Sequence, residues 1–325
     1  MIVDALILLA GLALVTLGAE WLVDGASAIA RKAGLSEFLI GMTIVGIGTS
    51  LPELVVSLAG AFRGSADIAI GNVVGSNIFN VLLILGVTAL ICPVVITREN
   101  ERRDIPLNIA VTLLLTLFGS WNLIIGTGKT DTIGAVEGGL FLLLFAAYIV
   151  YSFKNGKAVE PESSGEEKEG SPSDKTWLAV IMVLAGLAGL VFGGNLFVDS
   201  ACRIAREAGL SEKFVAITIL AGGTSMPELV TCVVAASKRK GALALGNIIG
   251  SNISNILLIL GTSALVCPLS FEHIKTVDLG VLILSSVALL ASAWTGRKNH
   301  SIGRGDGIAF LLLFSAYMTF LFLTI

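Results

Sequence analysis

Two glutamates, Glu53 and Glu228, each follow a short cluster of glycine, threonine, serine and proline inside an otherwise apolar segment. The clusters read Gly-Thr-Ser-Leu-Pro-Glu-Leu-Val and Gly-Thr-Ser-Met-Pro-Glu-Leu-Val. Proline lacks a backbone donor, so a helix is expected to break at each cluster. The unwound backbone would offer carbonyl oxygens to a hard cation beside the carboxylate. The alternative is that each glutamate only pins local structure, but a carboxylate deep in an apolar segment usually has a function.

A second polar motif also occurs twice. It consists of Gly-Ser-Asn and a second asparagine three positions after the first asparagine. It supplies Ser76, Asn77, Asn80, Ser251, Asn252 and Asn255. Ser76 and Asn80 are four residues apart and therefore share a helix face. With Glu53 they would form an oxygen-rich cluster without sulfur or imidazole, which suits sodium and calcium better than zinc or copper. The alternative is that these small and polar residues only join helices.

Both motifs belong to an internal duplication, in which residues 20–93 recur at a constant offset of 175. The segments 71–93 and 246–268 align without gaps and are identical at 16 of 23 positions. A match of this length indicates that the chain contains two copies of one structural unit.

The composition predicts the elements that must hold these residues. The chain has 55% hydrophobic and only 14% charged residues, so it is expected to lie in a lipid bilayer, and it lacks the basic face that nucleic-acid binding requires. Its apolar runs are continuous rather than alternating, which predicts an all-α integral membrane protein rather than strands. The expected spans are residues 3–22, 37–62, 67–91, 105–122, 135–153, 177–198, 212–237, 242–266, 277–294 and 306–324.

These ten spans divide into a first repeat at 1–153, an acidic linker at 154–175 and a second repeat at 176–325. Because five spans per repeat is an odd number, the repeats are expected to be inverted in the membrane, with discontinuous helices at the midplane. Loops after the odd-numbered spans carry 15 of the 21 lysines and arginines, which places them and the linker in the cytoplasm. Both termini are then outside an inner (plasma) membrane, and the first span is retained rather than cleaved as a signal peptide.

The paired Gly-Thr-Ser and Gly-Ser-Asn motifs resemble the two alpha repeats of the sodium/calcium exchanger family, within the cation/calcium antiporter superfamily. The resemblance extends from the first predicted span to the last. It implies that Glu53 and Glu228 bind calcium with backbone oxygens at Thr49 and Thr224, and that serines beside the carboxylates complete sodium sites. The full set of predicted ion ligands is Glu53, Glu228, Thr49, Thr224, Ser50, Ser225, Ser76, Ser251, Asn80 and Asn255.

The predicted function is therefore secondary active antiport of calcium against sodium by alternating access, with electrogenic calcium extrusion and no enzymatic step. No cofactor is expected beyond the transported calcium and sodium ions, and the partners are the lipid bilayer and these ions, with the protein acting as a monomer. A calcium/proton antiporter is an alternative. A potassium-dependent exchanger is another, although Asn255 stands where that branch of the family has Asp. A passive channel and an intramembrane hydrolase are more remote alternatives.

Four other residues are interpreted as structural. Asp24 and Asp199 recur at the repeat offset, and each lies seven residues before an arginine, Arg31 or Arg206, with which it could form an ion pair. The two histidines, His273 and His300, fall in predicted loops, so neither is expected to relay protons through the site.

Overall fold

A computed structural model describes residues 2–64, 66–126, 130–155, 176–208, 221–272, 274–295 and 301–324. In these ranges the regular structure is helical apart from four two-residue strands, which confirms the all-helical fold class. Most of the predicted linker at 154–175, the beginning of the predicted span 212–237, and both histidines lie outside the described residues.

The first copy contains, in chain order, α1 (Ile2–Ala33), α2 (Glu37–Ile40), η1 (Gly41–Val45), α3 (Gly46–Thr49), α4 (Leu51–Phe62), α5 (Ala66–Phe79), η2 (Asn80–Ile84), α6 (Leu85–Ile91), β1 (Val94–Val95), η3 (Asn100–Asp104), α7 (Ile105–Ile124), β2 (Thr132–Ile133) and α8 (Ala135–Asn155). Elements written η are π-helical turns.

The second copy contains α9 (Thr176–Glu207), α11 (Ala221–Gly223), α12 (Met226–Ser237), α13 (Gly241–Ser254), η6 (Asn255–Leu260), α14 (Gly261–Val266), β3 (Leu269–Ser270), α15 (Thr276–Thr295), β4 (Ser301–Ile302) and α16 (Arg304–Thr324). Where both copies are described, their helices follow each other in the same order.

Within the described residues, each predicted span coincides with one helix or with a run of consecutive helices. Among the described residues, eight helices are long and apolar enough to cross a membrane, and the bent pair Glu37–Thr49 and Leu51–Phe62 makes a ninth candidate. The helices extend beyond the predicted spans at 3–22 and 177–198, since α1 and α9 each have 32 residues. In α1 the helix continues through small residues, from Gly25 to Ala28, which are buried against neighbouring helices.

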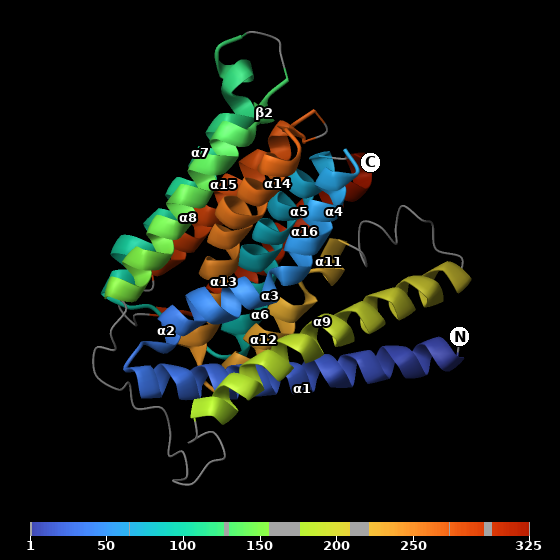
Figure 1. The fold of residues 1–325 in the computed structure, drawn as a ribbon, viewed down its shortest axis with the longest axis vertical. Coiled ribbons are helices and arrows are strands. Elements are labelled where there is room, and N and C mark those ends of the chain that lie inside the picture. The colour runs from blue at the N-terminus through green and yellow to red at the C-terminus, as the bar shows by residue number, and fades with distance from the viewer. Residues whose placement is uncertain are drawn as a thin grey trace.

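The two long helices α1 and α9 lie side by side and run across the other helices (Figure 1). Glycines bring their backbones into direct contact. A Cβ atom added to Gly18 would lie 2.8 Å from the carbonyl oxygen of Gly186, and one added to Gly186 would lie 2.7 Å from that of Gly18. Small residues of this kind let apolar helices pack closely in a membrane.

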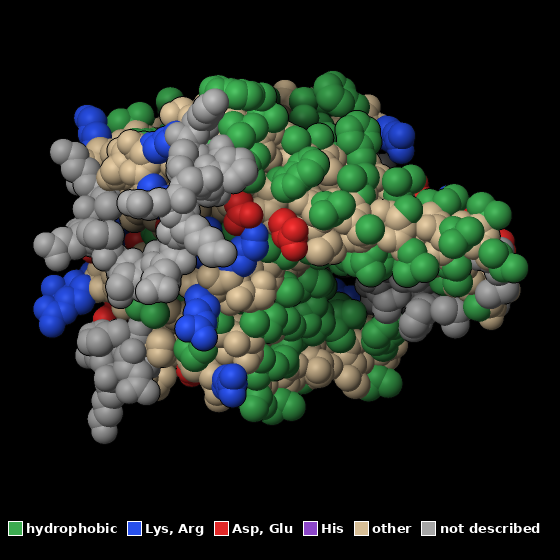
Figure 2. Space-filling view, turned by 90° about the horizontal axis from the view of Figure 1, so that it is seen from below, with side chains coloured by type: hydrophobic (Ala, Val, Ile, Leu, Met, Phe, Trp, Pro, Cys, Tyr) green, Lys and Arg blue, Asp and Glu red, His purple; other side chains and the backbone are tan. Residues whose placement is uncertain are grey.

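The centre of the molecule is formed by α13, which is enclosed by protein, whereas α16 is at the periphery. The helical run Gly241–Val266, which starts with α13, has 94% of the residues in its most apolar stretch buried. The corresponding share for α16 is 11%. The face seen in Figure 2 is largely apolar over its right half, and most of its charged side chains lie toward the left and centre of the view. A mainly apolar exterior around a polar centre is what a lipid solvent requires.

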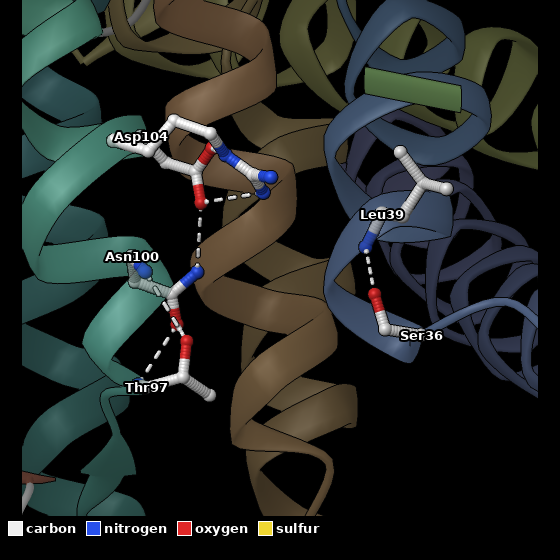
Figure 3. Close-up of polar contacts among 6 residues, drawn as sticks. Ser36, Leu39, Thr97, Asn100 and Asp104 are labelled. Carbon is white, nitrogen blue, oxygen red and sulfur yellow. Dashed lines mark hydrogen bonds and ion pairs between the residues drawn. The ribbon is translucent and has the colours of Figure 1, made fainter. Parts of the chain in front are cut away.

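Short polar and strand contacts fix the ends of the helices. Strand β1 pairs antiparallel with β4, and β2 pairs antiparallel with β3, so each ribbon joins one copy to the other. The Ser36 hydroxyl accepts a hydrogen bond from the backbone N–H of Leu39 at the start of α2, and Asn100 donates to Asp104 in the turn before α7 (Figure 3). These contacts satisfy backbone and side-chain groups at helix ends.

Candidate cation site

The two predicted helix breaks are present. In the first copy α3 ends at Thr49, Ser50 leaves the helical conformation, and α4 begins at Leu51 with a change of direction of 43°. In the second copy α11 ends at Gly223 and α12 begins at Met226. The proline in the first turn of each following helix has no backbone donor, which explains why the helix is interrupted there.

Glu53 and Glu228 lie in the first turns of α4 and α12, and each is only 1% exposed. Each glutamate is bound by the serine at the break of the other copy. The Ser50 hydroxyl donates to Oε1 of Glu228 at 3.2 Å, and the Ser225 hydroxyl donates to Oε1 of Glu53 at 3.1 Å. The reciprocal bonds bring both breaks and both carboxylates together at the centre of the molecule.

The remaining predicted hydroxyl residues surround the same point. Ser76 lies 3.2 Å from the Ser225 hydroxyl, and Ser251 donates to the backbone carbonyl of Gly46 at 3.1 Å. Thr49 is the last residue of α3 and Thr224 lies between α11 and α12, so both residues are at the breaks themselves. The structure therefore brings together residues that are far apart in the sequence, 205 positions in the case of Ser251 and Gly46.

Asn80 and Asn255 begin the π-helical turns η2 and η6, next to the glutamates' helices. Both are 1% exposed, and each donates its amide NH2 to an asparagine of the other copy, at 3.0 Å to Asn252 and at 2.9 Å to Asn77. The ten predicted ligands, all of which lie in the described residues, are thus grouped near the two helix breaks.

Several buried oxygens of this group accept no hydrogen bond from the described residues. They are Oε2 of Glu53, Oε2 of Glu228, Oδ1 of Asn80 and Oδ1 of Asn255. A buried acceptor without a donor is costly, so a native structure needs a partner for it. A cation is the partner that can satisfy several such oxygens at once, and carboxylate, amide and hydroxyl oxygens are hard ligands that suit calcium and sodium.

The described residues offer no alternative transition-metal centre. No group of three or more histidine, cysteine, aspartate or glutamate side chains in these ranges is arranged to hold a metal ion. Cys232 lies one turn after Glu228, but its thiol accepts from Asn247 and contacts the carbonyl of Ala244. The chemistry of the site is therefore that of oxygen ligands.

Asn72 and Asn247 contact the threonines at the helix breaks and are absent from the predicted ligand set. Asn72 donates to the Glu53 carbonyl at 3.2 Å, and its own oxygen accepts from Thr224 at 3.5 Å. Asn247, at the matching position of the second copy, accepts from Thr49 at 3.1 Å. Both recur at the offset of 175 within otherwise apolar helices, and that recurrence is the signal that would have identified them.

The interpretation of Asp24 needs correction. Its carboxylate forms an ion pair with Lys238 at 2.7 Å and lies 3.9 Å from Lys240, so it joins α1 to the end of α12 in the other copy. Proximity in the sequence favours Arg31 as the partner. The other copy nevertheless provides lysines at ion-pair distance, which sequence spacing does not reveal.

Comparisons with known proteins agree with this geometry. The family model described as sodium/calcium exchanger protein matches residues 3–154 and 178–323. The sodium/calcium exchanger MaX1 of Methanosarcina acetivorans is 35% identical, with 98% of this chain and 99% of that protein covered. The inner membrane protein YrbG of Escherichia coli is 33% identical, with 95% and 93% covered.

A solved structure shows the same fold. The structure of the sodium-calcium exchanger NCX_Mj soaked with 10 mM Na+ and 10 mM Sr2+ has a TM-score of 0.83 and 33% sequence identity, and the match covers 98% of each chain. The family model spans nearly all of the chain, and a full-length relative exceeds 30% identity. The chain is therefore a multi-pass membrane transporter that belongs to the sodium/calcium exchanger family.

Proposed function

We propose that this protein exchanges calcium for sodium across a membrane by alternating access. The observation that carries the proposal is the buried pair Glu53 and Glu228, each with one carboxylate oxygen that has no donor among the described residues. The relatives MaX1 and NCX_Mj, which are named as sodium/calcium exchangers, support the same ions as substrates.

In the proposed site, calcium binds to both carboxylates and to the backbone oxygens of Thr49 and Thr224. Sodium ions bind to the same carboxylates with the hydroxyls of Ser50, Ser225, Ser76 and Ser251, and the amide oxygens of Asn80 and Asn255 complete the set. Ions of both kinds then compete for Glu53 and Glu228. Because the two ions share these ligands, binding of sodium displaces calcium, and binding of calcium displaces sodium.

The charge of the site makes exchange obligatory. Two ionised glutamates carry a charge of about −2, which one calcium or two sodium ions would neutralise. An empty ionised site is costly in a low-dielectric centre, so the protein changes access only when ions are bound. With three sodium ions per calcium, the ratio that the family resemblance implies, one net charge moves per cycle, which is worth about 2.3 kcal/mol per 100 mV. Sodium entry then drives calcium out.

We also propose ten spans, formed by two inverted repeats at 1–153 and 176–325 and joined by a cytoplasmic linker at 154–175. The basic residues that follow the odd-numbered spans support this orientation, with both termini outside. The similarity to the inner membrane protein YrbG supports an inner (plasma) membrane location. A single chain contributes every ligand of the site, which supports function as a monomer.

Calcium uptake into reconstituted liposomes tests the coupling ion. We expect uptake when the liposomes are loaded with sodium and not when they are loaded only with acid at the same osmolarity. Uptake driven by the proton gradient alone would identify a calcium/proton antiporter, and uptake without any counter-ion would identify a channel.

Potassium dependence is tested in the same liposomes. Asn255 offers a neutral amide where the potassium-dependent branch has a carboxylate, so we expect sodium-driven calcium uptake to persist when a large organic cation replaces potassium. Loss of uptake under that replacement would assign the protein to the potassium-dependent branch.

A further inference from the structure

We propose that Asn77 and Asn252 orient the amide groups of Asn80 and Asn255, so that each amide turns its oxygen and not its NH2 group toward the transported cation. This inference rests on the proposed function and adds two positioning residues to the site. Neither residue belongs to the predicted ligand set, although both lie in the duplicated Gly-Ser-Asn motif.

Orientation matters because an asparagine amide has an acceptor and a donor in nearly equivalent positions. A half-turn of the amide exchanges Oδ1 and Nδ2 without any change in shape. A cation can bind only the oxygen, and it would be repelled by the NH2 hydrogens. Asn80 and Asn255 can therefore serve as ligands only if something in the protein selects one of the two orientations.

The structure provides this selection across the two copies. Asn80 donates its Nδ2 to Oδ1 of Asn252 at 3.0 Å, and Asn255 donates its Nδ2 to Oδ1 of Asn77 at 2.9 Å. With the NH2 groups occupied, the Oδ1 atoms of Asn80 and Asn255 remain buried and without a donor among the described residues. Those are the atoms that the proposed site needs for a cation.

A backbone contact gives the Asn77–Asn255 half of this network its direction. Asn77 donates its own Nδ2 to the backbone carbonyl of Asn252 at 3.1 Å. A carbonyl can only accept, so the NH2 group of Asn77 must face it and the Oδ1 atom must face Asn255. The orientation of Asn255 is thus set by the main chain of its own helix, through a side chain of the opposite copy.

The test is a comparison of calcium binding in two backgrounds, measured by titration calorimetry on the purified full-length protein in detergent with choline in place of sodium. Asn77→Leu removes the acceptor for Asn255, and we expect it to weaken calcium binding by about tenfold or more, as loss of a ligand-orienting partner commonly does. In the Asn255→Asp background the same substitution should change binding by less than about twofold, because both oxygens of a carboxylate accept and no orientation is needed.

Asn108→Leu is the matched control. Asn108 is also a fully buried asparagine, neither of its amide atoms has a partner among the described residues, and it lies on α7, which contributes none of the predicted ligands. We expect this substitution to leave calcium binding unchanged. If Asn77→Leu does not yield folded protein, the mirror pair Asn252→Leu, with and without Asn80→Asp, gives the same comparison.

The outcomes separate this inference from the proposed function. Equal loss of binding with and without the Asn255→Asp substitution would show a merely structural role for Asn77 and would overturn the inference alone. Unchanged binding in the Asn77→Leu single variant would also overturn it. Absence of calcium binding by the unsubstituted protein would overturn the proposed function itself and the inference with it.

Discussion

The two copies of the repeat meet in two places that use different chemistry. Along α1 and α9 they meet through glycine, where Gly18 and Gly186 bring backbone against backbone. At the centre they meet through polar side chains, where Ser50 bonds Glu228 and Ser225 bonds Glu53. Close packing of apolar helices joins the copies along α1 and α9, whereas hydrogen bonds between buried polar groups join them at the centre.

Both contacts occur twice, because each one recurs when its two residues are replaced by their equivalents 175 positions away in the other copy. Adding 175 to Ser50 gives Ser225, and subtracting 175 from Glu228 gives Glu53, so the two central hydrogen bonds are copies of each other. Likewise a Cβ atom on Gly11 would lie 2.9 Å from the carbonyl of Gly193, which is the copy of the contact between Gly186 and Gly18. One relation between the copies therefore generates a packing surface and a polar site. Substitutions that change only charge or only volume should separate the two.

The largest effect is expected from removing charge at the centre. Glu53→Gln or Glu228→Gln keeps the side-chain shape and removes one of two charges, so calcium is no longer compensated and exchange should be abolished. Membrane insertion and folding should be retained, because a neutral glutamine is easier to bury than an ionised glutamate. Sodium-driven calcium flux in liposomes and thermal unfolding in detergent measure the two properties.

Glu20→Gln is the matched control for this prediction, since Glu20 is an exposed carboxylate on α1 outside the predicted ligand set. It should leave calcium flux at the level of the unsubstituted protein. Near-normal flux in a properly folded Glu53→Gln or Glu228→Gln variant would contradict the proposed mechanism.

A smaller effect, on stability, is expected where the copies meet through glycine. A Cβ atom at Gly186 would lie 2.7 Å from backbone atoms of Gly18 and Leu22, so Gly186→Ala should cost about 1–3 kcal/mol of stability through overpacking. At Gly194, on the same helix, a Cβ atom meets nothing within 4 Å. Gly194→Ala should be neutral or stabilising by about 0.5–1 kcal/mol, because alanine favours a helix. Equal melting temperatures for the two variants would show that the glycine contact does not limit packing.

Much of this arrangement could be predicted from the sequence. The duplicated motifs identified the helix breaks, and the apolar runs located the helices, because both depend on local composition and on recurrence at one offset. The contacts that Asn72, Asn77 and Asp24 make with the other copy could not be predicted in this way. Each of them bonds to the other copy, and the register between two copies is set by tertiary packing that periodicity does not encode.

The smallest effect is expected at the ion pair between Asp24 and Lys238, which has no counterpart at the offset of 175 among the described residues. The corresponding residues Asp199 and Arg63 form no ion pair in the part of the chain that the structure describes, so this contact exists on one side only. The side chains of Asp24 and Lys238 are 41% and 30% exposed, and exposed pairs of this kind contribute about 1 kcal/mol or less. Asp24→Asn should therefore lower the melting temperature slightly, and Asp199→Asn should leave it unchanged. Equal shifts in the two variants would mean that the asymmetry at this contact has no energetic weight, whereas a large loss for Asp24→Asn alone would place α1 and α12 among the contacts that determine stability.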